Sequence, residues 1–238
     1  MVDQQPFNVL VFSKTSGYRH SSIPAGISSI HSLSAQTKLF TVHASEDASI
    51  FTPPTLARYS VILLLQCIGN IFEEEQFQAL KSFVRNGAGV VAIHGAAAGM
   101  PDDDWYGQLI GAHFDMHPDA EPGTILVESS ARNHYIVAGC GERQGWMDEW
   151  YNFRTHPRDN SNLQILLKGD MKSFNGGKMG DDHPLVWCQE FDGGRSFFTA
   201  LGHFDEAYRD EWFLKQILGG ILWAARREKD MDGATTSG

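Results

Sequence analysis

A histidine at the end of an apolar run is the first residue whose position suggests chemistry. Val90 to Ile93 predicts a short strand buried on both faces, and His94 follows it at once. Gly95 and three alanines come next, which allow a sharp turn into a helix. This is the pattern of a nucleophile elbow, which lifts one side chain to the carboxyl edge of a parallel sheet. The alternative is a histidine that merely ends the strand and hydrogen-bonds a backbone carbonyl.

Two other predicted strand ends carry side chains that suit the same chemistry. Tyr18, Arg19 and His20 lie in a polar loop after the first strand, just before a helix N-terminus with free backbone N–H groups. His203 follows a glycine at the end of the last strand. We expect the first and fourth strands to end close together, which would bring His20 near His94. Tyr18 and Arg19 would then bind substrate, although these residues also suit an ordinary surface loop.

Two carboxylates stand among aromatic residues in the segment from 145 to 153. Asp148 and Glu149 are followed by Trp150 and Tyr151, and alternation predicts a strand here. A carboxylate against an apolar aromatic wall is where a raised pKa or a sugar-binding platform would be built. The alternative is an exposed strand edge with ordinary acids.

A pair of histidines precedes this segment. His113 and His117 have the i, i+4 spacing that can place two ligands on one face of a helix. Gly111 and Pro118 favour a loop instead, so the pair is only a weak indication of a metal site.

The wider pattern predicts one α/β domain. Strands are expected over 8–12, 38–43, 59–67, 90–93, 124–129, 145–153, 163–168, 183–190 and 195–201, and helices over 23–33, 73–86, 102–110 and 210–227. Alternation of strand and helix in the first half implies a parallel sheet with right-handed crossovers. The residues from 51 to 57 are expected to form a turn, and Asp192-Gly193-Gly194 is expected to close an antiparallel hairpin.

Composition narrows the classes of function. The chain has 238 residues, which suits a single domain over 1–229 followed by a disordered polar tail over 230–238. A net charge of −10 argues against nucleic acid or an anionic membrane as partner. Three well-separated cysteines, Cys67, Cys140 and Cys188, indicate neither a disulfide framework nor a zinc ribbon. Without a signal-peptide pattern or a long apolar run, we expect a cytoplasmic protein.

Taken together, the motifs resemble the trehalose-utilisation (ThuA-like) family, within the class I glutamine-amidotransferase-like superfamily. The matching segments run in the family's order and are residues 17–20, 89–94, 111–118, 148–151, 184–187 and 198–203. The resemblance implies a flavodoxin-like three-layer α/β sandwich with a mostly parallel central sheet. It also implies a link to carbohydrate, particularly disaccharide, metabolism.

The same resemblance argues against amidotransfer. In true glutamine amidotransferases the elbow residue is a cysteine that forms a thioester with glutamine, whereas here it is His94, and none of the three cysteines lies at an elbow. Two further departures from the family pattern are Ala112, where relatives usually have glycine, and Trp150, where leucine is usual. Both would reshape the wall of the pocket.

We favour an enzyme whose pocket brings several histidines together. Because histidines titrate near neutral pH, such a cleft suits proton abstraction and donation. The family link makes a 3-keto-disaccharide or related glycoside the expected substrate, with isomerisation or cleavage of the glycosidic bond as the reaction. The expected catalytic residues are His94, His20, Glu149 and Tyr151, and the expected substrate-binding residues are Arg19, Tyr18, His117 and Trp187.

A divalent metal is compatible with the same residues. Neutral imidazoles with one carboxylate suit zinc, manganese or iron, and a metal with an open position could polarise the keto-sugar. His203 and His94 are the expected ligands, and no nucleotide cofactor is expected.

Two other classes of function remain open. One is a non-catalytic sugar-binding or regulatory protein, in which aromatic side chains would stack on sugar rings; the candidates are Trp105, Trp150, Tyr151 and Trp187. The other is a fold kept only for subunit assembly. The sequence leaves open whether the chain forms a homodimer.

Overall fold

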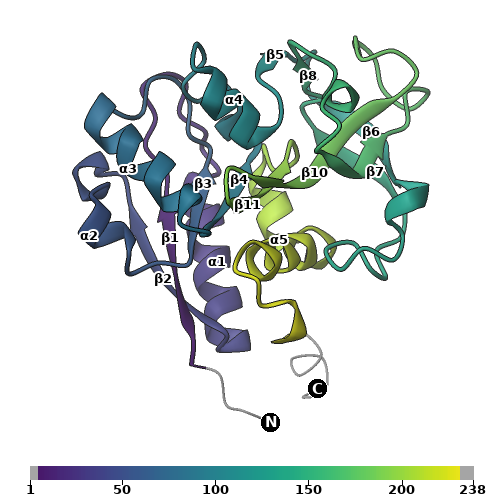
Figure 1. The fold of residues 1–238 in the computed structure, drawn as a ribbon. Helices are drawn as coiled ribbons and strands as arrows, with labels where there is room; N and C mark the ends of the chain where they lie inside the picture. Colours follow the sequence, from purple (N-terminus) through teal and green to yellow (C-terminus); the bar gives the residue numbers. More distant parts are fainter. Residues whose placement is uncertain (1–4, 231–238) are drawn as a thin grey trace.

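The apolar runs of the first half of the chain form the parallel half of one large sheet. The computed structural model describes residues 5–230. In it, five parallel strands lie in the order β2-β1-β3-β4-β11 (Figure 1). They are β1 (Phe7–Phe12), β2 (Phe40–Ser45), β3 (Val61–Leu65), β4 (Gly89–Ile93) and β11 (Gly194–Thr199). Every residue of β3 and β4 is buried, as expected for a sheet covered on both faces.

Four antiparallel strands extend this sheet. The order continues from β11 through β10 (His183–Phe191), β9 (Gln164–Gly169), β6 (Glu121–Val127) and β7 (Arg143–Asp148). The hairpin between β10 and β11 is confirmed, because Asp192 and Gly193 both have positive φ, as the favoured two-residue turn requires. The sheet is therefore mixed, with a parallel half and an antiparallel half.

The expectation of one strand over 145–153 was wrong. β7 ends at Asp148, and β8 (Asn152–Phe153) pairs with β5 (Phe114–Met116) in a separate two-stranded sheet. The chain turns away between them because Trp150 is fully buried and stacks on Phe174 with ring centroids 4.1 Å apart. This break places Glu149 outside the ladder.

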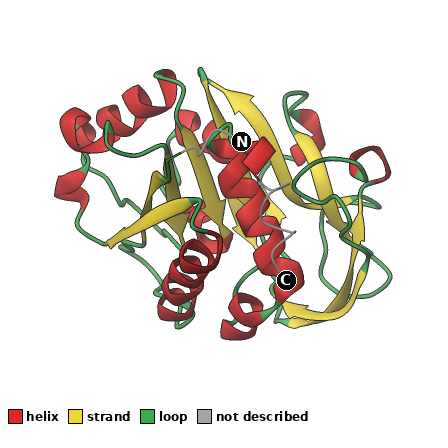
Figure 2. Cartoon of the chain, turned by 90° about the horizontal axis from the view of Figure 1, so that it is seen from below, coloured by secondary structure: helices red, strands yellow, loops and turns green. Residues whose placement is uncertain are grey.

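Helices cover both faces of the sheet (Figure 2). The main ones are α1 (Ile23–Thr37), α3 (Glu74–Arg85), α4 (Asp104–Ile110) and α5 (Glu211–Ala224). Since β2 lies on one side of β1 and β4 lies on the other side of β3, right-handed crossovers place α1 and α3 on opposite faces. The α/β architecture expected from the sequence is thus observed.

Several boundaries differ from those expected. The segment from 51 to 57, expected as a turn, contains the one-turn helix α2 (Pro53–Leu56), whose prolines occupy first-turn positions where no N–H partner is needed. Asp230 ends a short 3-10 helix over Glu228–Asp230, and the rest of the expected tail, residues 231–238, lies outside the described residues. Among the helices of residues 5–230, none has the length and apolar character needed to cross a membrane.

Candidate functional site

The carboxyl ends of β3 and β4 each continue into a residue with a left-handed backbone. His94 has φ 50° and opens a short 3-10 helix over His94–Ala98, where the sequence predicts a turn into a helix. Gln66, directly after β3, has φ 57°. A positive φ is uncommon for residues other than glycine and is found where surrounding contacts impose it. The elbow at His94 is therefore present, and a second sharp turn lies beside it.

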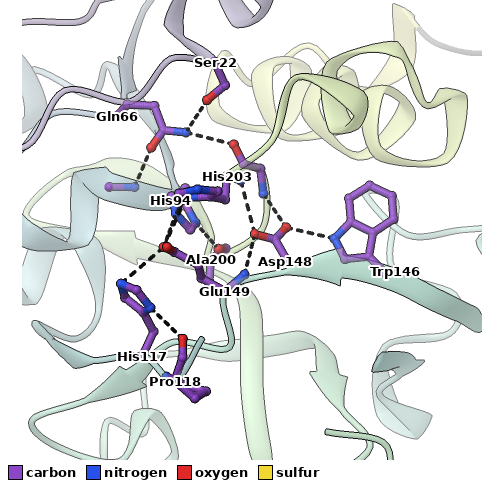
Figure 3. Close-up of polar contacts among 12 residues, drawn as sticks. Ser22, Gln66, His94, His117, Pro118, Trp146, Asp148, Glu149, Ala200 and His203 are labelled. Atoms are coloured by element: carbon purple, nitrogen blue, oxygen red, sulfur yellow. Dashed lines mark hydrogen bonds and ion pairs between the residues drawn. The ribbon is translucent and has the colours of Figure 1, made fainter. Parts of the chain in front are cut away.

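Three histidines converge on one carboxylate oxygen (Figure 3). Glu149 Oε2 lies 3.2 Å from His94 Nε2, 3.1 Å from His203 Nδ1 and 3.4 Å from His117 Nε2. The nitrogens of His94 and His203 are 3.3 Å apart. His20 completes a group of four with His94, Glu149 and His203, whose ligand atoms all lie within 4.8 Å of one another. We call these four residues the His–Glu cluster.

The hydrogen bond at one ring nitrogen fixes the tautomer of His94. Its Nδ1 lies 2.6 Å from the carbonyl oxygen of Ala200, which can only accept, so Nδ1 carries the proton. In the neutral ring Nε2 is then a lone pair, and it faces Glu149 Oε2, a second acceptor. Two acceptors this close are stable together only when a cation, either a proton or a metal ion, lies between them.

His20 is the neutral member of the cluster. Its ring is 4% exposed and packs edge-on against the rings of His94 and His203, with centroids 5.0 Å away in both cases. Burial and the neighbouring histidines lower the pKa of His20 to about 3. Its Nδ1 is buried and has no hydrogen-bond partner within residues 5–230. The predicted approach of His20 to His94 is thus observed, although β3 separates the two strands.

Glu149 and His203 form the charged pair of the cluster. Burial would raise the pKa of Glu149, but the contacts and positive charge of His203 and His94 outweigh it and hold the pKa well below its usual range. Burial would lower the pKa of His203, and the hydrogen bond and charge of Glu149 raise it overall. Glu149 is therefore ionised, and the raised pKa favours the protonated form of His203 when no metal is bound.

Tyr151 and His117 form the outer wall of the cluster. The Tyr151 ring packs between His94 and His117, with centroid distances of 4.2 and 5.7 Å. Burial and the nearby charge of Glu149 raise the pKa of Tyr151 well above its usual value, so its phenol keeps its proton. The His117 side chain is 35% exposed, and its Nδ1 bonds the carbonyl of Pro118 at 2.8 Å. His117 is therefore the part of this wall that an incoming molecule can reach.

Two residues expected to bind substrate lie at the edge of the cluster. Tyr18 is 63% exposed and packs edge-on against His20 at 4.9 Å. Arg19 is exposed and forms an ion pair with Glu46 at 2.6 Å. Tyr18 thus borders the cluster directly, whereas the charge of Arg19 is already paired.

The tryptophans do not form a sugar-stacking platform. Trp187, expected to bind substrate, is 1% exposed, donates to the Ile110 carbonyl and packs against Phe198. Trp150 is equally buried, and Trp105 is held by a hydrogen bond to Asp192. A buried indole cannot stack on a sugar ring, so Trp150 and Trp187 do not support the sugar-binding alternative, and the partly exposed Trp105 lies outside the cluster. The structure does not bring Trp187 into the cluster.

The i, i+4 histidine pair is split by the fold. His113 bonds the backbone carbonyl of Asp103 at 3.1 Å, away from the cluster, while His117 reaches Glu149. The short strand β5 lies between the two histidines, which confirms that this segment is not a helix.

Sequence reasoning missed two buried residues that contact the cluster's backbone, Gln66 and Asp148. Gln66 is the single polar residue after the apolar run of β3, and that contrast is a signal that could have identified it. Asp148 precedes Glu149 and was noticed only as one of two acids. Both are fully buried and bond to the segment that carries His203.

Two cavities lie in other parts of the molecule, outside the cluster. One of about 480 Å³ lies between α4 and residues 155–162 and includes no member of the cluster. Another of about 410 Å³ is lined by Trp146, Met147 and Phe204, and the Phe204 ring packs edge-on against His203. Neither cavity is lined by a member of the cluster, and the second approaches it only through Phe204.

Comparison with known proteins identifies the family. Two solved structures described as ThuA-like match over most of both chains. The one from Bacteroides uniformis has TM-score 0.71 and 20% identity and covers 94% of each chain. The one from Parabacteroides merdae has TM-score 0.72 and 19% identity and covers 92% of this chain and 90% of its own.

A third structure and the family model extend this comparison. A cytoplasmic protein of Salmonella typhimurium has TM-score 0.63 and 12% identity, covering 91% of this chain and 98% of its own. These three structural similarities show a shared fold. A comparison with curated protein sequences found no match to the chain. The model of the ThuA family, described as trehalose utilisation, matches residues 8–224, and the chain therefore belongs to this family.

Proposed function

We propose that this protein is a carbohydrate-converting enzyme that acts on a keto-disaccharide or related keto-glycoside, using the histidines around Glu149 and a divalent metal ion. The family places the chain in carbohydrate utilisation. The observation that carries the proposal is the convergence of three imidazole nitrogens on Glu149 Oε2, within 3.4 Å. Such convergence in a partly open site is suited to moving protons and is costly to keep in a purely structural core.

The donor set of the His–Glu cluster fits a transition-metal ion. Ligands about 2.1 Å from a tetrahedral zinc ion stand about 3.4 Å apart. The three separations among His94, His203 and Glu149 are 3.1, 3.2 and 3.3 Å. His20 offers an Nδ1 without a partner among the described residues, and the bond from His94 Nδ1–H to the Ala200 carbonyl orients that ring toward the site. Zinc, manganese and iron all accept imidazole with one carboxylate.

The metal would be held by His20, His94, Glu149 and His203. When bound, it would polarise a sugar carbonyl and so acidify the neighbouring C–H bond. His117 lies outside this ligand group and is the most exposed of the site's histidines, so we assign it the proton transfer. Tyr151, which keeps its proton, is the donor candidate on the same wall.

The reaction follows from the chemistry of a 3-keto-glycoside. A base removes the proton on carbon 2, next to the carbonyl, and the electron pair forms a carbon–carbon double bond as the glycosidic C1–O bond breaks. The departing sugar oxygen takes a proton from the acid. Return of the proton to carbon 3, with the hydroxyl proton passing from O2 to O3 and the leaving group retained, moves the carbonyl to carbon 2 and gives isomerisation instead. Both outcomes use the same acid and base.

The test is proton NMR of the purified protein with 3-keto-trehalose and with trehalose, each with and without EDTA. The proposal expects consumption of the keto-sugar, loss of that activity with EDTA, and recovery on adding back zinc or manganese. Line broadening without turnover would instead favour a non-catalytic sugar-binding protein. Absence of any effect on either sugar would remove the disaccharide assignment.

The finer assignments belong to the same proposal. The strand order β2-β1-β3-β4 of the parallel half supports a flavodoxin-like, class I amidotransferase-like fold, in which the order 2-1-3-4-5 recurs. His94 in place of an elbow cysteine argues against amidotransfer. We further propose a cytoplasmic location and a small-molecule sugar as partner, without nucleic acid, membrane or nucleotide cofactor.

A further inference from the structure

Asp148 is a buried carboxylate whose neighbours all donate to it. It is the last residue of β7 and is 0% exposed, and its side chain faces the backbone at Gly202 and His203 (Figure 3). Its four donors are Trp146 Nε1 at 2.8 Å, Glu149 N at 3.0 Å, Gly202 N at 2.8 Å and His203 N at 3.2 Å. Three of these four are backbone groups of Glu149, His203 or the residue before it.

Gln66 holds the same segment from the other side. Its Nε2 donates to the carbonyl oxygen of Gly202 at 2.8 Å, and its Oε1 accepts from Gly95 N at 2.9 Å. Weaker contacts at 3.3 Å reach Ser22 Oγ and Tyr208 Oη. One fully buried amide therefore ties the end of β3 to the elbow after His94 and to the segment before His203.

The two side chains meet at Gly202. Asp148 binds its N–H and Gln66 binds its C=O, so both peptide groups that flank this residue are fixed. Gly202 has φ 112°, a conformation that side chains with a Cβ rarely adopt. The segment has Ala200 on one side, whose carbonyl orients His94, and His203 on the other.

We infer that Asp148 and Gln66 are positioning residues that clamp Gly202 and so set the distances among His94, His203 and Glu149. Neither touches the reacting groups through its own side chain. A buried carboxylate or amide destabilises the fold unless its polar atoms are hydrogen-bonded. Asp148 and Gln66 direct hydrogen bonds to the backbone around the cluster. The inference rests on the proposed function only in using a metal ion as one of its probes.

The variant Asp148→Asn tests the clamp, because it keeps the shape of the side chain and replaces one acceptor oxygen by an NH₂ group. Cobalt(II) is titrated into the EDTA-treated protein, followed by calorimetry and by visible absorption. We expect affinity to fall about 10–100-fold, the usual cost of losing an outer-shell contact, with a changed cobalt spectrum. Asp148→Asn that melts cooperatively and binds cobalt with wild-type affinity and spectrum would overturn the inference.

Trp146→Phe is the matched control. It removes one hydrogen bond to Asp148 but leaves the three backbone donors in place. We expect a lower melting temperature with unchanged cobalt affinity and spectrum. Equal loss of affinity in Trp146→Phe and Asp148→Asn would mean that general destabilisation, and not the clamp, is responsible.

Gln66→Met is the second variant, which decides the matter if Asp148→Asn does not fold. It removes the contacts to Gly202 and Gly95 at similar size, and we expect the same direction of change. The metal-free readout is the ring-nitrogen NMR shifts of His94 and His203, which should move in both clamp variants and stay in Trp146→Phe. If wild type binds no cobalt, the metal part of the proposed function fails, whereas unmoved shifts would refute the clamp itself.

Discussion

Two fully buried histidines, His94 and His183, lie in opposite kinds of surroundings. His94 bonds the Ala200 carbonyl through one nitrogen and faces Glu149 and His203 with the other. Neither ring nitrogen of His183 has a hydrogen-bond partner within residues 5–230. Burial lowers the pKa of His183 to about 4, against a smaller opposing effect of the Tyr151 backbone.

The difference shows what burial does with and without polar partners. His183 packs edge-on against Phe174 at 5.1 Å and acts as an apolar ring that must stay neutral. His94 has the same 0% exposure, but its partners orient the ring, with Nδ1–H on the Ala200 carbonyl and Nε2 facing Glu149 across the position of a proton or metal ion. Burial alone therefore does not identify a reactive histidine, and the arrangement of partners does.

The largest effect is expected from removing His94. His94→Ala should lower turnover of the keto-sugar by about 10²–10⁴-fold, because both a ligand and the tautomer-fixing contact to Ala200 disappear. His183→Met, a matched change at an equally buried ring, should leave turnover near wild type. Rates are measured by NMR at saturating metal. Comparable losses in the two variants would show that the contrast between the two histidines is only one of packing.

The next-largest effect is expected in the free energy of unfolding at acid pH, to which buried His183 contributes. The folded pKa of His183 is about 4, below the unfolded value of 6.5, so the unfolded chain binds a proton that the folded chain excludes. The free energy of unfolding is therefore unaffected by His183 above pH 6.5. It falls by about 3 kcal/mol as the pH is lowered toward 4. His20, whose pKa is about 3, acts in the same direction in every variant compared.

Urea unfolding at pH 7.5 and pH 4.5, with EDTA present, measures this loss. His183→Met should lose less free energy of unfolding between the two pH values than wild type. It should cost little at pH 7.5, because it replaces unbonded nitrogens by an apolar side chain. Parallel pH profiles for the two proteins would show that His183 is not the acid-sensitive group.

Much of the fold could be read from the sequence because its strands are unambiguous. The runs in β3 and β4 are wholly apolar and bounded by turn signals, and the carboxyl ends of parallel strands must share one edge. That reasoning placed His20, His94 and His203 together correctly. The prediction succeeded because the direction of parallel strands decides at which edge of the sheet those residues lie.

The rest of the site could not be predicted from the sequence, because it depends on side-chain packing, which the periodicity of apolar residues does not encode. The segment after Asp148 leaves the sheet because Trp150 is buried, and this turn is what directs Glu149 at the histidines. An aromatic residue suits a core as well as a sugar platform, so Trp187 could not be assigned from sequence. The role of Gln66 depends on three segments that meet only after folding.

The smallest effects are expected at the exposed edge of the cluster. Arg19→Ala breaks an exposed ion pair with Glu46, which should change the free energy of unfolding by less than about 1 kcal/mol. Tyr18→Ala removes the ring that borders His20 and should raise KM with kcat unchanged. Urea unfolding checks the first change, and steady-state kinetics of both variants checks the second. A large fall in kcat for either variant would show that the reacting groups lie at this exposed edge and not in the cluster.

Metal stoichiometry tests the central claim most directly. Wild type, His94→Ala, Glu149→Gln and His183→Met are stripped with EDTA, dialysed against zinc or manganese, and analysed for bound metal. The account predicts one equivalent in wild type and in His183→Met, and loss of binding in His94→Ala and Glu149→Gln. Wild type without bound metal, or His94→Ala that keeps a full equivalent, would contradict it.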